Sequence, residues 1–361
     1  MNIREIARIA GVSHSTVSRA LRNNPHISRS TRERIQKIAE DNGYRPHPMV
    51  SKLMAQLPHV RQQARSTIAL ITCWKNWERV NFLKQMHQGT LERADALGFK
   101  LEEFSLYEYK MSAKRLNGVL HARNIEGVII FPFDREHREL ELDWQHFASV
   151  YIGRFLQHPN LNRISTSYYA NMLLVLAQLK TLGYKRIALA LTTEMRLRSE
   201  DAYVAAYSAY ERDIPTDLRI PILVTSASPE VESRKTLPGQ YEYTDKLESQ
   251  SAVNWLKKHQ ADAIISNSSP RLETLAEGGI KVPDDLGYAS LDCTNLDQTI
   301  SGVDQQPILL GSAAVDMLTA HLHRNEIGIP QYPKIMTIQS RWHSGKTAVS
   351  QQNLLTKASV T

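Results

Sequence analysis

Residues 2–22 have the spacing of two short helices joined by a tight turn, with the sequence NIREIARIAGVSHSTVSRALR. Apolar residues recur at helical intervals in both halves, so each half is predicted to form a helix with one apolar face. Gly11 stands where a glycine in left-handed conformation ends a helix without steric cost. Ser13 is a good N-cap for the second helix. The segment is therefore predicted to be a helical hairpin, packed through Ile3, Ile6, Ala7, Ala10, Val17, Ala20 and Leu21.

The second helix of this hairpin turns a row of polar side chains outward, namely His14, Ser15, Ser18 and Arg19. Such a row suits the groove of DNA, although an ordinary amphipathic hairpin would also expose polar residues. Charge separates the two interpretations. Residues 1–65 hold twelve Lys and Arg against four Asp and Glu, whereas the rest of the chain holds 32 against 33. Binding to phosphates requires a compact cationic module of this kind.

A third helix is predicted after residue 27, capped by Ser28 or Ser30 and turning Ile35, Ile38 and Ala39 inward. Tyr44 follows it and is the only aromatic residue among the first 65, so we expect it to fill a very small core. Thr31 and Arg32, at the start of the helix, are placed to hold backbone phosphate.

The next segment, residues 48–57, has an apolar stripe only two turns long between prolines. A helix this short does not persist alone in water. It is either a plain linker or a helix that forms on DNA and wedges an apolar side chain into the minor groove. Residues 59–66 are polar and basic, and mark the domain boundary.

From residue 67 the chain alternates short apolar strands with amphipathic helices, which predicts parallel sheets in doubly wound layers. The number of units indicates two such lobes, with a ligand cleft where the carboxyl ends of the strands meet. The strand candidates are TIALITC, EGVIIFPF, ASVYIG, RIALAL, IPILV, DAIIS and LGYASLD, and the helix candidates are LKQMHQGTLERADALG, AKRLNGVLHARN, MLLVLAQLKTLG and SQSAVNWLKKHQ.

Aromatic residues follow the first strand in CWKNWERVNF, which offers Trp74, Trp77 and Phe82, and Phe133 follows a later strand. They are either core residues or faces on which a carbohydrate stacks. Trp74 and Arg154 are the stronger ligand candidates, because each directly follows the carboxyl end of a strand.

Several other classes of protein and site are not expected. The first residues, MNIREIARIA, lack the apolar region of a secretory signal, and no run of about 18 apolar residues could span a membrane. The chain has two cysteines, which fits a reducing cytoplasm. SGKT at 344–347 lacks the earlier glycine of a phosphate-binding loop and is read as a tail. Because His321 and His323 diverge on a helix and no nucleophile turn occurs, we expect no metal, no cofactor and no catalysis.

The chain resembles LacI/GalR-type transcriptional regulators over essentially its whole length. The head motif IREIARIAGVSHSTVSRALRNN…ISRSTRERI…GYRP is highly specific, and LGYKRIALAL, GIKVPDDLGYASLD, GVDQQPILLGSAAVDML and IQSRWHSGKT follow in the expected order. The resemblance implies an α/β protein with an all-α helix-turn-helix head and a two-lobed, periplasmic-binding-protein-like (type I) core with parallel sheets. The implied domains are a head at 1–47, a hinge helix and linker at 48–65, and a core at 66–361. Within the core we expect a first lobe at about 66–165 and 306–325, and a second at about 166–304 and 330–343.

The resemblance also implies contacts to DNA. His14, Ser15 and Arg19 fall where the family reads base edges, with Arg19 suited to guanine. Leu53 matches the hinge leucine that opens the central base step. The positions that match backbone contacts are Ser13, Thr16, Ser18, Asn23, Ser28, Thr31 and Arg32.

In the core, the resemblance makes Asp292 an effector-binding residue. The family's effector-clamping arginine corresponds to Arg196 or Arg198 here, and we favour Arg198. Trp74 and Arg154 are the other effector-binding candidates. Gln305 falls near a residue that closes the cleft in some members. Thr166 and Ser268-Ser269 replace acidic and amide residues of the family, so acceptors for sugar hydroxyls are lost.

The expected function is a cytoplasmic, homodimeric regulator, a repressor, that binds a pseudo-palindromic DNA operator and responds to a small effector related to carbohydrates. Two other classes are weighed against it. A solute-binding receptor with a related core would not need the basic head. An enzyme acting on a small carbohydrate would turn over its substrate.

Overall fold

The computed structural model describes residues 3–21, 27–44, 66–106, 112–133, 139–225, 241–244, 247, 249–267, 272–294 and 299–352. Predictions on Asn23, on Leu53 and the hinge helix, and on Ser268-Ser269 lie outside these residues. No helix among the described residues has the length and apolar character needed to cross a membrane.

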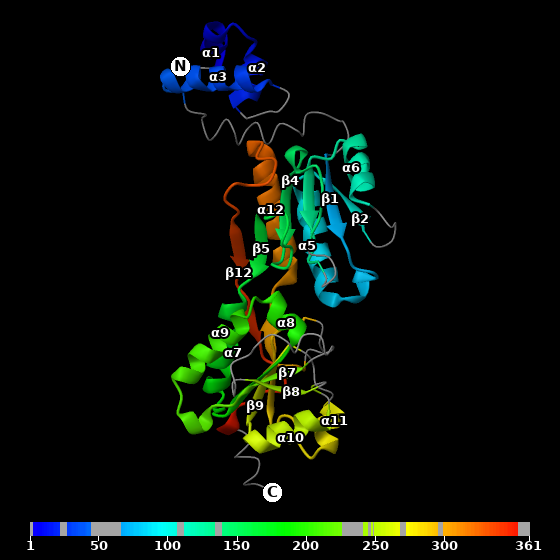
Figure 1. Ribbon diagram of the computed structural model, residues 1–361, viewed down its shortest axis with the longest axis vertical. Coiled ribbons are helices and arrows are strands. Elements are labelled where there is room, and N and C mark those ends of the chain that lie inside the picture. The colour runs from blue at the N-terminus through cyan, green and yellow to red at the C-terminus, as the bar shows by residue number, and fades with distance from the viewer. Residues whose placement is uncertain are drawn as a thin grey trace.

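The head consists of three short helices around a small apolar core (Figure 1). Gly11 ends the first helix with φ +65°, and Ser13 Oγ accepts a hydrogen bond of 3.1 Å from the Thr16 amide. Ser28, and not Ser30, caps the third helix by accepting from the Thr31 amide at 3.3 Å. Tyr44 packs against the core, so the predicted hairpin and its filling residue are confirmed. The helices are α1 Ile3–Ala10, α2 His14–Leu21 and α3 Arg29–Asp41, and the buried residues are Ile6, Ala7, Ala10, Val17, Ala20, Ile35 and Ala39.

The first lobe is a parallel sheet with the strand order β12-β5-β4-β3-β1-β2. Helices α5 and α12 cover one face, where Leu83 and Leu310 are buried, and α6 covers the other with Leu116. The strands are β1 Thr67–Thr72, β2 Lys100–Ser105, β3 Gly127–Ile130, β4 Ala148–Ile152, β5 Arg163–Thr166 and β12 Ile335–Ile338. The helices are α5 Asn81–Ala96, α6 Ala113–Ala122 and α12 Pro307–Arg324, with short 3-10 turns η2 Trp77–Arg79 and η3 Trp144–His146.

The second lobe is a sheet with the order β13-β11-β10-β9-β6-β7-β8, parallel except that β13 runs antiparallel to β11. Val175 of α7 and Tyr207 of α9 are buried on one face, and Leu256 of α10 and Leu275 of α11 on the other. The strands are β6 Ile187–Thr192, β7 Ile222–Thr225, β8 Tyr241–Thr244, β9 Ala263–Ser266, β10 Gly287–Ser290, β11 Gly302–Asp304 and β13 Arg341–His343. The helices are α7 Tyr168–Thr181, α8 Thr193–Arg198, α9 Ala202–Arg212, η4 Thr216–Leu218, α10 Gln250–His259 and α11 Leu272–Glu277.

The chain passes between the two lobes three times, after β5, after β11 and after β12. The predicted α/β class, with an all-α head and two parallel-sheet lobes, is therefore confirmed. One predicted boundary is wrong: residues 330–343 do not belong wholly to the second lobe. Their first strand, β12, pairs with β5 in the first sheet, so Ile335 lies beside Arg163, and only β13 joins the second sheet.

The SGKT stretch after β13 is a packed tail on the second lobe. Thr347 Oγ1 donates to the Tyr288 carbonyl at 2.8 Å and accepts from the Ser301 amide at 2.9 Å. Its hydroxyl therefore serves the packing of this segment, which opens no helix of the kind that follows a phosphate loop.

Candidate functional site

The outer face of α2 is the first candidate site. Val17 and Ala20 on its inner face are fully buried, whereas His14 and Arg19 are exposed on the other. Gln36 of α3 donates to the Ala20 carbonyl at 3.2 Å and so ties α2 to α3. The helix that carries the predicted base contacts is therefore anchored by one face and exposes the other. Ser15 lies on the same helix, but its side chain is outside the described residues.

The predicted phosphate contacts gather at the amino ends of α2 and α3. Ser13 and Thr16 share a hydrogen bond of 2.9 Å between their hydroxyls, and Ser28 donates to Thr31 Oγ1 at 2.8 Å. Ser18 lies farther along α2, and Arg32 follows Thr31 in the first turn of α3. The partial positive charge at a helix N-terminus favours a phosphate there.

The interlobe site lies where the strands of the two sheets end. Trp74, Arg154 and Asp292 each stand two residues after a strand: β1, β4 and β10, respectively. Arg198 ends α8, which directly follows β6. The predicted effector residues therefore all come from the edge at which ligands bind in doubly wound sheets.

Arg154 reaches from the first lobe to the second. Its Nη2 donates to Glu200 Oε2 at 2.8 Å, and the guanidinium of Arg198 lies 5.7 Å from the centre of the Phe155 ring. Burial raises the pKa of Tyr168 to about 12, while the positive charges of Arg198 and Arg154 act in the opposite direction. Arg154 and Arg198 therefore both lie close enough to Tyr168 to influence its pKa, in the region between the lobes.

Asp292 lies on the other side of this region. Its Oδ1 accepts a hydrogen bond of 2.9 Å from the Thr294 amide, and burial, with a further contribution from Asp304, raises its pKa. The Thr294 carbonyl accepts from Asn81 Nδ2 of the first lobe at 2.5 Å, which makes a second bridge between the lobes.

One polar atom at these bridges is a candidate for contact with a ligand. Arg154 Nε is buried and has no hydrogen-bond partner in the part of the chain that the structure describes. Buried polar groups are nearly always paired, so such atoms are candidates for contact with a polar ligand or water.

Arg196 makes hydrogen bonds and a ring contact within the second lobe. Its guanidinium makes two hydrogen bonds to Asp201, of 2.8 and 3.1 Å, and lies 4.5 Å from the centre of the Tyr241 ring. All three residues belong to the second lobe. Arg198 is also paired, with Nη2 donating to Glu194 Oε1 of its own helix at 2.7 Å, but its guanidinium in addition lies near Phe155 of the first lobe.

The aromatic residues of the first lobe serve mainly as packing. Phe133 is fully buried, and the Trp74 indole N–H donates to the Pro132 carbonyl at 2.6 Å. Trp74 is half-buried against both apolar clusters of the lobe. Trp74 can offer a ring face to a ligand, but its indole N–H is already hydrogen-bonded to the Pro132 carbonyl.

Sequence reasoning missed Glu200, Asn81 and Asn267. Asn267 directly follows β9 and bonds both the amide and the hydroxyl of Thr192, the last residue of β6, at 2.9 and 3.0 Å. Its position after a strand was a usable signal. No such signal marks Glu200, which follows α8 with a φ of 52°.

Thr166, which replaces an acidic residue of the family, and Gln305, which falls near a cleft-closing position, both lie at crossings between the lobes. Thr166 Oγ1 lies 3.0 Å from Ser340 Oγ of another crossing and accepts from Asn171 at 2.9 Å. Gln305 is buried and donates to the Leu291 carbonyl at 2.9 Å. Both residues therefore contribute to the joint between the lobes.

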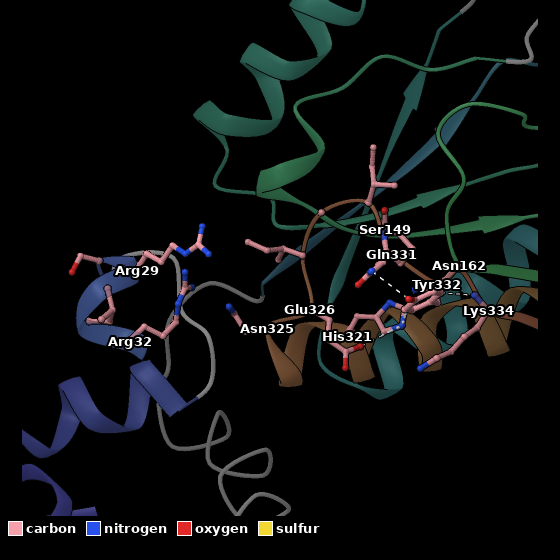
Figure 2. Close-up of a pocket in the computed structure, with 16 residues that line it drawn as sticks. Arg29, Arg32, Ser149, Asn162, His321, Asn325, Glu326, Gln331, Tyr332 and Lys334 are labelled. Atoms are coloured by element: carbon pink, nitrogen blue, oxygen red, sulfur yellow. Dashed lines mark hydrogen bonds and ion pairs between the residues drawn. The ribbon is translucent and has the colours of Figure 1, made fainter. Parts of the chain in front are cut away.

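A separate cavity of about 800 Å³ lies at the opposite, amino-terminal edge of the first sheet (Figure 2). Ser149, Asn162, His321 and Lys334 of the first lobe line it, together with residues of the head such as Arg32. None of the four predicted effector residues lines this cavity.

Comparison with known proteins matches both parts of the chain. Residues 2–47 match the family of bacterial regulatory proteins named after lacI, and residues 176–339 match the periplasmic binding protein-like domain. The chain therefore combines a head of the LacI type with a periplasmic-binding-protein-like core domain. The HTH-type transcriptional regulator TreR of Escherichia coli is 30% identical over 145 residues, which are 40% of this chain and 43% of TreR. The match thus spans less than half of that relative.

Two solved structures of transcriptional regulators share the fold over almost the whole chain. A complex of the transcriptional regulator CelR with cellobiose has a TM-score of 0.56 at 18% identity, and covers 96% of this chain and 99% of its own. The Lac repressor dimer bound to operator and the anti-inducer ONPF has a TM-score of 0.52 at 18% identity, covering 97% and 99%. The arrangement of a head and two lobes is thus common to all three.

Proposed function

We propose that this protein is a sequence-specific DNA-binding repressor of the LacI family that acts in the cytoplasm. One observation carries the proposal: α2 exposes His14 and Arg19 on a head of the family's DNA-binding type, while its other face is fixed in the core. Because one small head buries too little surface for strong discrimination, two heads of a homodimer would read a pseudo-palindromic operator. The backbone contacts would come from the amino ends of α2 and α3.

The proposed effector is a small carbohydrate or a carbohydrate derivative bound between the lobes, beside Arg154, Arg198, Asp292 and Trp74. The unpaired Arg154 Nε at one of the interlobe bridges supports a polar ligand. CelR, which shares the fold, was solved with cellobiose. An effector that binds the closed core better than the open one would shift the lobes and thereby the operator affinity. The proposed activity needs no catalysis.

The DNA-binding part of the proposal is tested by selecting duplexes from a random pool with the full-length protein, and then measuring their affinity for Arg19→Ala. The expected site is a pseudo-palindrome. Losing a bidentate contact to guanine costs about 1–3 kcal/mol, so Arg19→Ala should bind about five- to 150-fold more weakly and lose preference at one position per half-site. Arg212→Ala, at the exposed end of α9, is the control and should match the wild type. An unchanged preference in Arg19→Ala would show that α2 does not read bases through this residue.

The effector is sought by a thermal-shift screen of sugars and sugar derivatives, followed by operator titration with each hit. A hit that raises the melting temperature and changes operator affinity supports the proposal. A protein that binds sugars but selects no duplex would instead be a solute receptor.

A further inference from the structure

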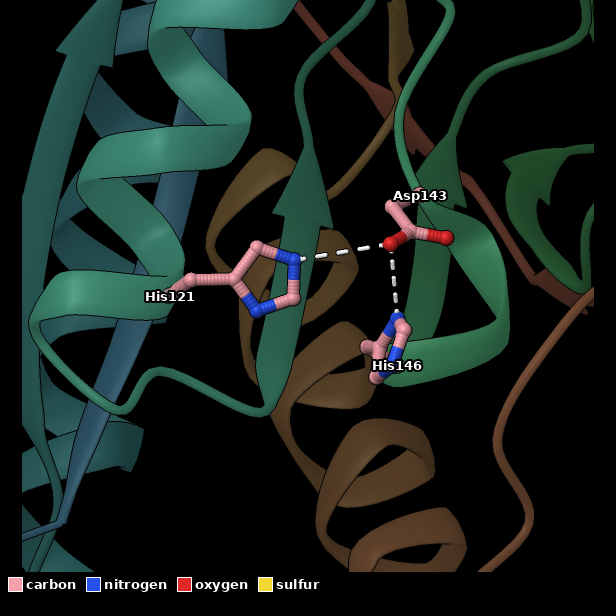
Figure 3. A group of neighbouring side chains, drawn as sticks. All are labelled: His121, Asp143 and His146. Carbon is pink, nitrogen blue, oxygen red and sulfur yellow. Dashed lines mark ion pairs between the residues drawn. The ribbon is translucent and has the colours of Figure 1, made fainter.

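Three metal-ligating side chains converge on the first lobe, apart from the interlobe site (Figure 3). His121 follows Leu120, the last buried leucine of α6. Asp143 is the N-cap of η3, and His146 is the last residue of η3. Both imidazoles point at one carboxylate oxygen: His146 Nδ1 lies 2.9 Å and His121 Nε2 3.6 Å from Asp143 Oδ2. The three ligand atoms all lie within 4.8 Å of one another.

These separations are close to those of a bound transition metal. Zinc binds imidazole nitrogen and carboxylate oxygen at about 2.0–2.2 Å, which places tetrahedral ligands about 3.3–3.5 Å apart. The distances of 2.9 and 3.6 Å lie on either side of that value. The ligand nitrogens of His121 and His146 lie within 4.8 Å of each other, so all three ligand atoms border one small volume. The side chains are 41%, 39% and 48% exposed for His121, Asp143 and His146, so an ion and its water ligands could enter without unfolding the lobe.

The surrounding residues hold the carboxylate in a ligating orientation. The Asp143 amide donates to Asn117 Oδ1 at 2.9 Å, and Gln145 Nε2 donates to Asp143 Oδ1 at 2.9 Å. Oδ1 is thereby engaged, and Oδ2 faces the two imidazoles. The His121 ring lies against the buried Phe147 ring, with 5.4 Å between centres. Partners of this kind orient the ligands in metal sites.

We propose that His121, Asp143 and His146 form a mononuclear site for a divalent transition metal ion, with Zn²⁺ as the reference ion. Two imidazoles and one carboxylate suit Zn²⁺ and its neighbours Co²⁺ and Ni²⁺ better than Mg²⁺ or Ca²⁺, which prefer oxygen ligands. Water fills the remaining positions of the ion. The site would connect the end of α6 to η3 at the edge of the sheet where β3 and β4 begin. None of the residues proposed for DNA or effector binding belongs to this cluster.

The test is calorimetric titration of the full-length, metal-free protein with Zn²⁺, alongside the visible absorption of bound Co²⁺. The wild type should bind one ion per chain at this site, with d–d bands from Co²⁺ and a rise in melting temperature. His146→Gln and Asp143→Asn should each bind Zn²⁺ at least tenfold more weakly. His323→Gln, which removes an exposed histidine at the end of α12, is the matched control and should bind as the wild type does.

Two results would overturn the proposal. The first is binding of Zn²⁺ that His146→Gln and Asp143→Asn leave unchanged. The second is a wild type whose melting temperature and Co²⁺ spectrum do not respond to the ions, in which case the cluster is a hydrogen-bonded network alone. Urea denaturation of each variant without metal confirms that any loss of binding is not a loss of folding.

Discussion

Arg154 and Asp292 occupy equivalent positions, each two residues beyond a strand of its own lobe, yet their surroundings differ. The guanidinium of Arg154 faces the carboxylate of Glu200. The carboxylate of Asp292 accepts from the Thr294 amide, and its burial near Asp304 raises its pKa. At the scale of residues, the interlobe site therefore holds one compensated cation and one carboxyl group whose ionisation opposes folding.

Asp292→Asn should stabilise the protein at pH 7. Because the pKa of Asp292 is higher in the folded chain than in the unfolded one, folding is favoured while this carboxyl is protonated, and stability falls as the pH rises through the two pKa values. The asparagine has no charge to bury and can still accept from the Thr294 amide. Urea denaturation should show the variant more stable than the wild type at pH 7, with the difference disappearing below the ordinary aspartate pKa of about 3.9.

The control for this measurement is Asp213→Asn, at the exposed end of α9. It should follow the wild type across the pH range. An Asp292→Asn protein that is less stable than the wild type at pH 7 would mean that the carboxylate charge stabilises the fold.

At the scale of elements, α5 and α12 approach so closely that two glycines are required. A Cβ on Gly89 would lie 2.0 Å from the Ile308 carbonyl oxygen, and one on Gly311 would lie 2.1 Å from that of Met86. Both obstacles are backbone atoms, which cannot turn aside as a side chain can. Ser312 Oγ adds a hydrogen bond of 3.2 Å to the Gly89 carbonyl. This contact fixes α12, which begins just after a crossing between the lobes.

Gly311→Ala should destabilise the first lobe by about 1–3 kcal/mol, the usual cost of overpacking a close contact. Gly118→Ala is the matched control, because Gly118 also lies in a helix but a Cβ there meets nothing within 4 Å. That substitution should stabilise the protein by about 0.5–1 kcal/mol through helix propensity. Equal urea midpoints for the two variants would show that α5 and α12 can separate at little cost.

The strands that sequence patterns predicted are those buried on both faces, such as β1, β4 and β9. The edge strand β2 was not predicted, because its sequence KLEEFS is charged and only partly buried. β12 was assigned to the wrong lobe for a related reason. Ile335 and Met336 are exposed on β12, so apolar residues in this strand do not mark burial in a core. Only the hydrogen bonds between β12 and β5 show which sheet β12 joins.

At the scale of the whole molecule, hydrogen bonds between described residues join the lobes across the cleft, from Arg154 to Glu200 and from Asn81 to the Thr294 carbonyl. Each can form only while the lobes are close together. Both hydrogen bonds therefore favour the closed arrangement of the lobes. A bound effector would either replace these hydrogen bonds or add to their effect.

Glu200→Gln should shift the core toward an open arrangement by removing the charge that attracts Arg154. A partly exposed ion pair contributes about 0.2–1 kcal/mol, so the affinity for an effector found by the thermal-shift screen should fall about 1.5- to fivefold. Small-angle X-ray scattering should show a larger radius of gyration. Glu326→Gln, which breaks a pair with Arg324 inside the first lobe, is the control and should change neither value. An unchanged effector affinity in Glu200→Gln would mean that this pair does not hold the lobes together.

The sequence by itself determined the head, the alternation of strands and helices, and the strand ends at which Arg154, Arg198 and Asp292 lie. These features depend on contacts between residues near in the chain: helix caps, periodic apolar faces and turns. Only the tertiary structure decided the lobe of β12, the partnership of Arg154 with Glu200, and the meeting of His121 with Asp143 and His146. Each of these depends on side chains from distant segments, whose separation is set by sheet order and helix packing and leaves no periodic trace in the sequence.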